Sequence, residues 1–335
     1  MMLKKILCLG NIAFDFIQLR KERSGRLLFD AMPGGSVFNT AVISARLGLD
    51  VAIVSKTGRD VLGKKLVDTL KNEHICTDFV IQDPAIRTGL ALAAIDKKGD
   101  SSYVFYKPGG RENAFRKGQA PVSLLKDFSV LHTASAYTYG DHTYEDSTRF
   151  LSAAKKNGLF IFYDPNWREN RVKNVPKALK RIQNIISLSD MLKLSEADAL
   201  ALTRAKTLDS ALKKLPENII VTLGAKGSFF FNGKTKIFQP AFRVKTVDTI
   251  GAGDAFTAGL IRCFRDKGVD AFSKSIRDTL KFASAASAIV CKARGACLAL
   301  KSLKQVNLFL SGRASCGMPA AKGLRSSISG LSSTA

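Results

Sequence analysis

Two glycines and a carboxylate lie close together in residues 248–256, which read DTIGAGDAF. Gly251 and Gly253 can adopt positive φ and have no Cβ, so backbone N–H groups can approach an anion closely. A helical pattern follows, and such a segment predicts an anion hole and a general base for phosphoryl transfer. The anion hole would be Gly251, Ala252 and Gly253, and the base Asp254. An aspartate that caps a helix after a glycine turn would give the same short pattern.

A second glycine pair lies far earlier in the chain, in residues 33–39 (PGGSVFN). Gly34 and Gly35 lead into a helical pattern that carries Asn39 near its first turn. Asp15 ends a largely apolar run that begins at Ile6. Together, the carboxylate, the amide and the backbone donors could bind several hydroxyls of one small polyol. A glycine-rich helix entry without a ligand is the alternative.

These two stretches, in this order, resemble the two signatures of the ribokinase or PfkB family of carbohydrate kinases. The resemblance covers roughly residues 3–310. It implies an α/β fold with a doubly wound, mostly parallel sheet, helices on both faces and a small β-sheet lid. It also implies an ATP-dependent sugar kinase that uses Mg²⁺. The implied substrate-binding residues are Asp15, Gly34, Gly35 and Asn39.

Four further segments match the family's pattern. Residues 164–168 (DPNWR) resemble the D-P-N-x-R segment of fructokinases and 2-keto-3-deoxygluconate kinases, which makes Arg168 a substrate-side candidate; a surface ion pair is the alternative. Residues 193–196 (KLSE) resemble the N-x-x-E element with a lysine in its first place. There, Glu196 would organise water around magnesium.

The turn at residues 222–227 (TLGAKG) resembles the family's nucleotide-side turn, although a tight turn into a hairpin would look the same. The ATP-binding candidates are thus Lys193, Glu196, Thr222, Gly224 and Gly227. Residues 294–296 (RGA) resemble the segment with a Gly-Ala pair that lies beside the anion hole and the monovalent-cation loop of related kinases. We leave a requirement for K⁺ open.

Short apolar runs alternate with amphipathic helical patterns, which is typical of a mostly parallel sheet covered on both faces. The expected strands are residues 6–13, 51–55, 130–133, 159–163, 191–194 and 219–223, and the clearest helices are 37–47, 61–72 and 144–156. Ligands of such folds bind beyond the carboxyl ends of the strands. Asp15, Asp164 and Thr222 lie at or just after such predicted ends.

Two β-rich segments, about residues 16–31 and 87–107, break the alternation. We expect them to form a small separate sheet, which the resemblance identifies as a lid that excludes water from the sugar site; two surface hairpins are the alternative. A later hairpin at 228–239 should continue the main sheet. The kinase domain is therefore predicted over 1–310, and the tail 311–335 is expected to be poorly ordered.

Composition agrees with one enzyme domain. The 335 residues are 46% hydrophobic, and no run reaches the roughly 20 apolar residues that a membrane-spanning helix needs. Six scattered cysteines lack the spacing of a disulfide framework or a zinc site, so we expect a cytoplasmic protein. The net charge of +24 raises the question of nucleic acid, but the basic residues are dispersed without aromatic interleaving. We expect no nucleic-acid and no membrane partner, and leave a homodimer open.

Some residues depart from known patterns. Residues 58–65 (GRDVLGKK) nearly spell a P-loop, but Lys65 cannot offer magnesium a hydroxyl. Asn11 stands where fructokinases often carry Glu, and it resembles the opening of adenosine kinases. Residues 36–38 replace the usual small residues, and Lys107 takes the place of a frequent lid arginine.

The sequence therefore favours ATP-dependent phosphorylation of a primary hydroxyl of a small sugar, foremost a ketohexose such as fructose. A 2-keto-3-deoxygluconate kinase, a ribokinase and a nucleoside (adenosine) kinase of the same family are the alternatives. A catalytically silent regulator that binds sugar or nucleotide is the alternative from another class, and the intact Asp254 and its glycines speak against it. A basic nucleic-acid-binding module is a weaker rival.

Overall fold

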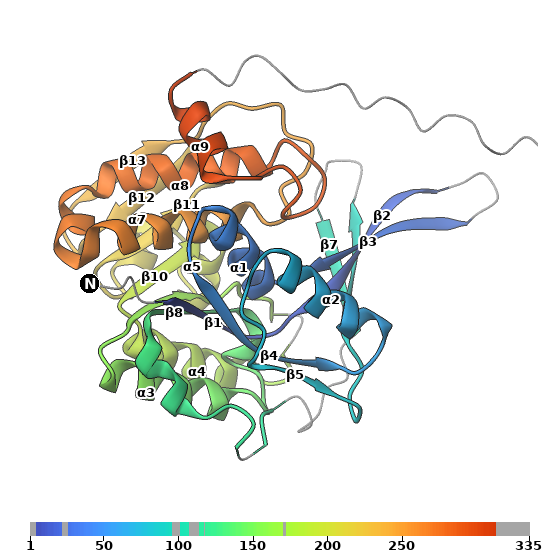
Figure 1. The fold of residues 1–335 in the computed structure, drawn as a ribbon. Helices are drawn as coiled ribbons and strands as arrows, with labels where there is room; N and C mark the ends of the chain where they lie inside the picture. Colours follow the sequence, from blue (N-terminus) through green and yellow to red (C-terminus); the bar gives the residue numbers. More distant parts are fainter. Residues whose placement is uncertain are drawn as a thin grey trace, which may run out of the picture.

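The computed structural model describes residues 5–21, 26–95, 101–106, 114–116, 118–169 and 172–312. Within these residues, a nine-stranded sheet has the order β13-β12-β11-β10-β9-β8-β1-β4-β5 (Figure 1). Its strands are β1 (Lys5–Leu9), β4 (Val51–Gly58), β5 (Val80–Asp83), β8 (Phe128–Ala134), β9 (Phe160–Asp164), β10 (Met191–Ser195), β11 (Ile219–Thr222), β12 (Gly227–Phe231) and β13 (Lys236–Pro240). Neighbouring strands are parallel except for the pairs β11-β12 and β12-β13. The predicted mostly parallel sheet is confirmed.

Helices cover both faces of this sheet (Figure 1). One face carries α1 (Ser36–Arg46), α2 (Val61–Asn72), α7 (Ala252–Lys274) and α8 (Ile276–Val290), with α9 (Leu303–Leu310) packed against α8. The other carries α3 (Tyr144–Lys156), α4 (Val175–Leu188), α5 (Glu196–Thr203) and α6 (Leu208–Leu212). In β1, Ile6 and Cys8 pack toward α1 and α7, whereas Leu7 and Leu9 pack toward α3 and α4. Apolar side chains on both faces are typical of a covered parallel sheet.

A second sheet has the order β3-β2-β6-β7 and projects from the edge of the main body (Figure 1). Its strands are β2 (Ala13–Lys21), β3 (Leu27–Gly34), β6 (Gly89–Ile95) and β7 (Ser101–Tyr106). The expected small sheet is therefore present and is built from the two predicted segments. Residues 96–100, inside the second predicted segment, and Lys107 lie outside the described residues.

One strand prediction was wrong in its length. The apolar run from Ile6 was expected to form a single strand to Ala13, but β1 ends at Leu9 and β2 of the small sheet begins at Ala13. Gly10 stands between them with φ of 155°. Asp15 is consequently the third residue of a strand in the small sheet, rather than a residue at the end of a main-sheet strand.

Other local predictions agree with the structure. The three expected helices appear as α1, α2 and α3 within one residue, and the hairpin β12-β13 extends the main sheet. The strand β5 was not predicted. The segment that resembles a P-loop begins α2, where Asp60 caps the helix by accepting a hydrogen bond from the Gly63 N–H at 2.9 Å. In the part of the chain that the structure describes, no helix is both long and apolar enough to span a membrane. Most of the predicted tail, from residue 313 on, lies outside the described residues.

Candidate active site

Two cavities meet at the N-terminus of α7. The first, of about 340 Å³, lies between the small sheet and the main body and is lined by Asp15, Asn39 and Asp254 among other polar residues. The second, of about 570 Å³, extends along the far side of α7 toward β11 and α8. Both cavities share a wall that contains Arg168 and Gly253. A small polar cavity that joins a larger one suits two different ligands that must react with each other.

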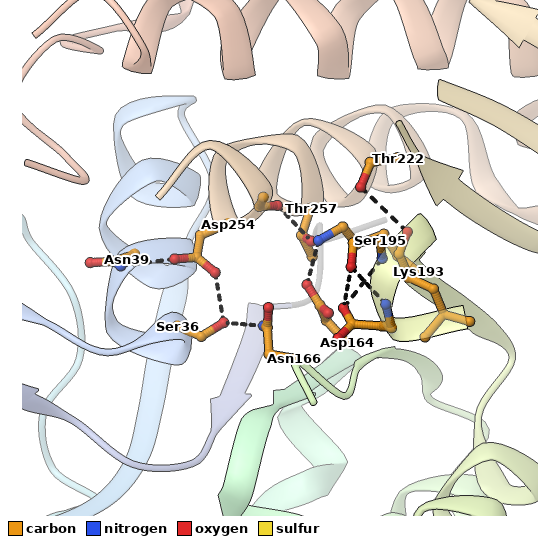
Figure 2. A network of polar contacts seen from close by, with 12 residues as sticks. Ser36, Asn39, Asp164, Asn166, Lys193, Ser195, Thr222, Asp254 and Thr257 are labelled. Carbon is orange, nitrogen blue, oxygen red and sulfur yellow. Dashed lines mark hydrogen bonds and ion pairs between the residues drawn. The ribbon is translucent and has the colours of Figure 1, made fainter. Parts of the chain in front are cut away.

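Asp254 lies in the first turn of α7 and faces the first cavity. Its carboxylate accepts hydrogen bonds from the Ser36 hydroxyl at 2.6 Å and from the Asn39 side-chain amide at 2.8 Å (Figure 2). Burial raises the pKa of Asp254, and these two hydrogen bonds act in the opposite direction. The first turns of α1 and α7, far apart in the sequence, thus converge on one carboxylate.

Asp15 approaches the same cavity from the small sheet. Burial, together with the nearby charge of Asp254, raises the pKa of Asp15 to about 7, although a hydrogen bond from the Gly35 backbone opposes the shift. A Cβ on Gly34 would overlap the Asp15 carboxylate. Gly34 itself does not line the cavity, so its contribution is to leave room for Asp15. Gly35, at φ of 100°, makes the turn into α1.

Asp248 and the 294–296 loop hold the glycine turn before α7 in place. Gly251 has φ of 78°, and a Cβ there would collide with Ala296. Asp248 accepts hydrogen bonds from the Ile250 N–H at 2.9 Å and from the Gly295 N–H at 2.8 Å. The predicted glycine pair 251/253 and the predicted 294–296 loop therefore lie together. The positive end of the 23-residue helix α7 begins at this turn.

Lys193 forms a buried ion pair with Asp164 at 2.6 Å (Figure 2). Burial would lower the pKa of Lys193, but the charge and the hydrogen bond of Asp164 outweigh it, and the net shift is upward. A Cβ on Gly253 would lie 2.9 Å from the Lys193 ammonium. A protonated lysine therefore lies beside the N-terminus of α7, and the two together favour a bound anion.

The other nucleotide-side candidates line the second cavity, with one exception. Thr222, Gly224 and Gly227 lie along it, and Gly227, at φ of 126°, has no room for a Cβ because the Gln239 carbonyl is in contact. Glu196, the first residue of α5, is not part of the lining. Asp198, two residues further along, is part of it.

The acidic residues near the second cavity fit a hydrated Mg²⁺, which usually binds one or two carboxylates, waters and substrate phosphates. Asp198 lines the cavity, and its pKa is raised by burial and by the charge of Asp164. Asp164 has one buried carboxylate oxygen, Oδ1, without a hydrogen-bond partner in the described structure. Among the described residues, no three His, Cys, Asp or Glu side chains form a cage for a metal.

The structure thus brings together most of the predicted site. The first cavity collects Asp15, Gly35, Asn39, Arg168, Gly251, Gly253 and Asp254, and the second collects Lys193, Thr222, Gly224, Gly227 and Ala252. Sequence reasoning missed Ser36 and Asn166, which contact each other at 3.0 Å, and Asp198. Both Ser36 and Asn166 lie inside segments that were recognised, but no pattern of spacing connects them.

Known proteins resemble this chain over most of its length. The model of the pfkB family carbohydrate kinases matches residues 3–303. Fructokinase-1 of Oryza sativa subsp. japonica is 30% identical over 274 residues, which cover 80% of this chain and 85% of the relative.

Solved structures show the same fold. A fructokinase from Xylella fastidiosa with bound ATP has a TM-score of 0.84 and 26% identity, over 94% of this chain and 100% of the other. A fructokinase double mutant from Vibrio cholerae O395, with fructose, ADP and potassium ion bound, has a TM-score of 0.81 and 24% identity, over 92% and 98% of the two chains. The ribokinase-like fold class predicted from the sequence is confirmed.

The raised pKa of Asp15 predicts a pH-dependent gain in stability for Asp15→Asn. Because the folded-state pKa of about 7 lies above the ordinary value of 3.8, the folded wild type binds more protons than the unfolded chain between these values. The free energy of unfolding of the wild type therefore falls as the pH rises through this window. The variant should become progressively more stable than the wild type from about pH 4 to about pH 7, as measured by urea denaturation.

Asp209→Asn is the matched control. Asp209 is on the surface, where a hydrogen bond from Lys236 lowers its pKa. That variant should show no such rise in relative stability between about pH 5 and pH 7. Parallel stability curves for the wild type and Asp15→Asn would contradict the raised pKa.

Proposed function

Since the chain belongs to the pfkB family of carbohydrate kinases, we propose that it transfers the γ-phosphoryl group of ATP to a primary hydroxyl of a small sugar, foremost a ketohexose such as fructose. The observation that carries the proposal is the meeting of the two cavities at Gly253, with Asp254 at the junction. A sugar in the first cavity and a nucleotide in the second would direct a hydroxyl and a phosphoryl group toward the same helix N-terminus. The fructokinase relatives support the ketohexose.

The residues that line the first cavity can both donate and accept hydrogen bonds. Asp15 accepts from hydroxyls, the Asn39 amide both donates and accepts, and Arg168 donates at the boundary between the cavities. The small sheet covers this cavity through Leu90, Ala91 and Phe105. Excluding water there strengthens the polar contacts and disfavours transfer of the phosphoryl group to water.

Asp254 would accept the proton of the attacking hydroxyl, since it is the carboxylate at the junction. Backbone N–H groups of the turn Gly251 to Gly253, the N-terminus of α7 and the Lys193 ammonium would stabilise charge on the transferred group. Mg²⁺ would neutralise charge on the phosphate oxygens, held by Asp198 and, through water, by Glu196. The family resemblance of the 294–296 loop leaves a monovalent cation such as K⁺ as part of the proposal.

We also propose a cytoplasmic homodimer. The five described cysteines are free, which suits a reducing compartment. The small sheet exposes the large apolar side chains of Leu27, Val104 and Tyr106, which a second copy of the chain would cover. Light scattering of the purified protein measures its oligomeric state directly. A monomer at micromolar concentration would overturn the proposed dimer without affecting the kinase proposal.

The test of the substrate is ADP production with ATP and Mg²⁺ against a panel of fructose, tagatose, ribose, 2-keto-3-deoxygluconate and adenosine. Turnover that is greatest with fructose supports the ketohexose. Greatest turnover with another member of the panel reassigns the substrate within the family. Silence across the panel while ATP still binds would favour the regulatory alternative.

Asp254→Asn should retain sugar affinity and lose about 10²–10⁴ in kcat, because one well-placed general base contributes that much to rate. The amide is nearly the same size, and its oxygen can still accept a hydrogen bond from Ser36 or from Asn39. Isothermal titration with the sugar and a steady-state assay separate the two quantities. Near-normal kcat would show that another group accepts the proton.

Gly251→Ala should lower kcat by about 10² or more, because the added Cβ collides with Ala296 and φ of 78° disfavours any side chain, so the anion hole must move. Gly48→Ala is the control: Gly48 has φ of 81° but open space around its Cβ position, at the end of α1. Both variants should lose stability, and only Gly251→Ala should lose kcat. Equal kcat values in the two variants would contradict the role of the turn.

A further inference from the structure

We infer that Ser36 is a positioning residue of the phosphoryl transfer, whose hydroxyl orients the Asp254 carboxylate and keeps it ionised for its work as a base. The inference rests on the proposed function, since it assumes that Asp254 accepts the proton. Ser36 is the first residue of α1 and lies in the segment 36–38, where the sequence departs from the small residues usual in related kinases.

Ser36 has two hydrogen-bond partners. The Asn166 side-chain amide donates to the Ser36 oxygen at 3.0 Å, and an N–H group can only donate. The Ser36 hydroxyl in turn donates to Asp254 Oδ1, 2.6 Å away, because an ionised carboxylate can only accept (Figure 2). Asn166 holds φ of 43°, a left-handed conformation that asparagine tolerates better than most residues. The result is a directed chain from Asn166 through Ser36 to Asp254.

A second chain reaches the other carboxylate oxygen. Asn39 donates to Asp254 Oδ2 at 2.8 Å, and the Cys297 thiol donates to the side-chain oxygen Oδ1 of Asn39 at 3.6 Å. The thiol thus favours the orientation in which the amide nitrogen of Asn39 faces Asp254. Each carboxylate oxygen has one neutral donor and retains acceptor capacity for a substrate hydroxyl.

The charges around Asp254 make these neutral donors necessary. Burial opposes the ionised form, and so does the neighbouring carboxylate Asp164. Lys193 favours ionisation, but it is already paired with Asp164. The Cys297 thiol contacts Asn39, and desolvation raises its pKa to about 12, so it adds no charge at neutral pH. The hydrogen bonds from Ser36 and Asn39 offset the effect of burial on the pKa of Asp254.

The test is the pH profile of kcat/KM for the sugar in Ser36→Ala, at saturating ATP and Mg²⁺. Loss of a hydrogen bond to an ionised group should raise the pKa of the base and move the acid limb to higher pH by about one unit, a tenfold change in acid dissociation. At high pH, kcat should stay within a few-fold of the wild type. Ser36→Thr retains a hydroxyl and should return the limb toward its wild-type position.

Ser44→Ala is the matched control, because Ser44 is a buried serine of the same helix whose hydroxyl has no partner in the described structure. Its profile should coincide with that of the wild type. If Ser36→Ala fails to fold, Ser36→Cys, a weaker donor of similar size, should shift the limb in the same direction by less.

Two results separate this inference from the proposed function. An unshifted acid limb in Ser36→Ala, with a raised KM alone, would show that Ser36 only contacts the sugar, and the inference would be wrong while the kinase proposal stands. Full turnover by Asp254→Asn would instead remove the base itself, and the mechanism proposed for the kinase would fall together with the inference.

Discussion

The proposed phosphoryl transfer depends on keeping a carboxylate ionised in a place from which water must be excluded. A general base at a phosphoryl-transfer site has to be buried, and burial alone favours its neutral form. The fold resolves this conflict by bringing the N-termini of α1 and α7 together, so that neutral donors from one helix reach Asp254 on the other. Apolar contacts between the two helices, such as those of Ile43 and Leu47 with Ala255 and Ala258, hold this arrangement.

Most of the fold could be predicted from the sequence, because each buried strand and amphipathic helix leaves a local pattern. The boundary between β1 and β2 could not. An apolar run reports that residues are buried, but it does not report in which sheet, and the chain passes from one sheet to the other at Gly10 without losing its apolar character. The strand β5 was missed because it has four residues that are mostly only partly buried.

Some features of the site could likewise be predicted from local sequence, and others could not. The glycines were predictable because a turn without a Cβ is a local requirement, and Gly251 meets it through its contact with Ala296. The bond between Ser36 and Asp254 spans 218 positions of the chain, and only the completed fold creates it. Glu196 and Asp198 show a second limit: residues two apart on a helix point in different directions, and only Asp198 lines the second cavity.

The wall shared by the two cavities has a thermodynamic consequence. Because Arg168 and Gly253 line both, the two ligands would contact the same groups, and their binding free energies cannot be independent. Linkage then requires reciprocity: whatever factor a sugar applies to the affinity for nucleotide, the nucleotide applies to the affinity for sugar. Selectivity for the sugar would therefore be set partly by the nucleotide that occupies the neighbouring cavity.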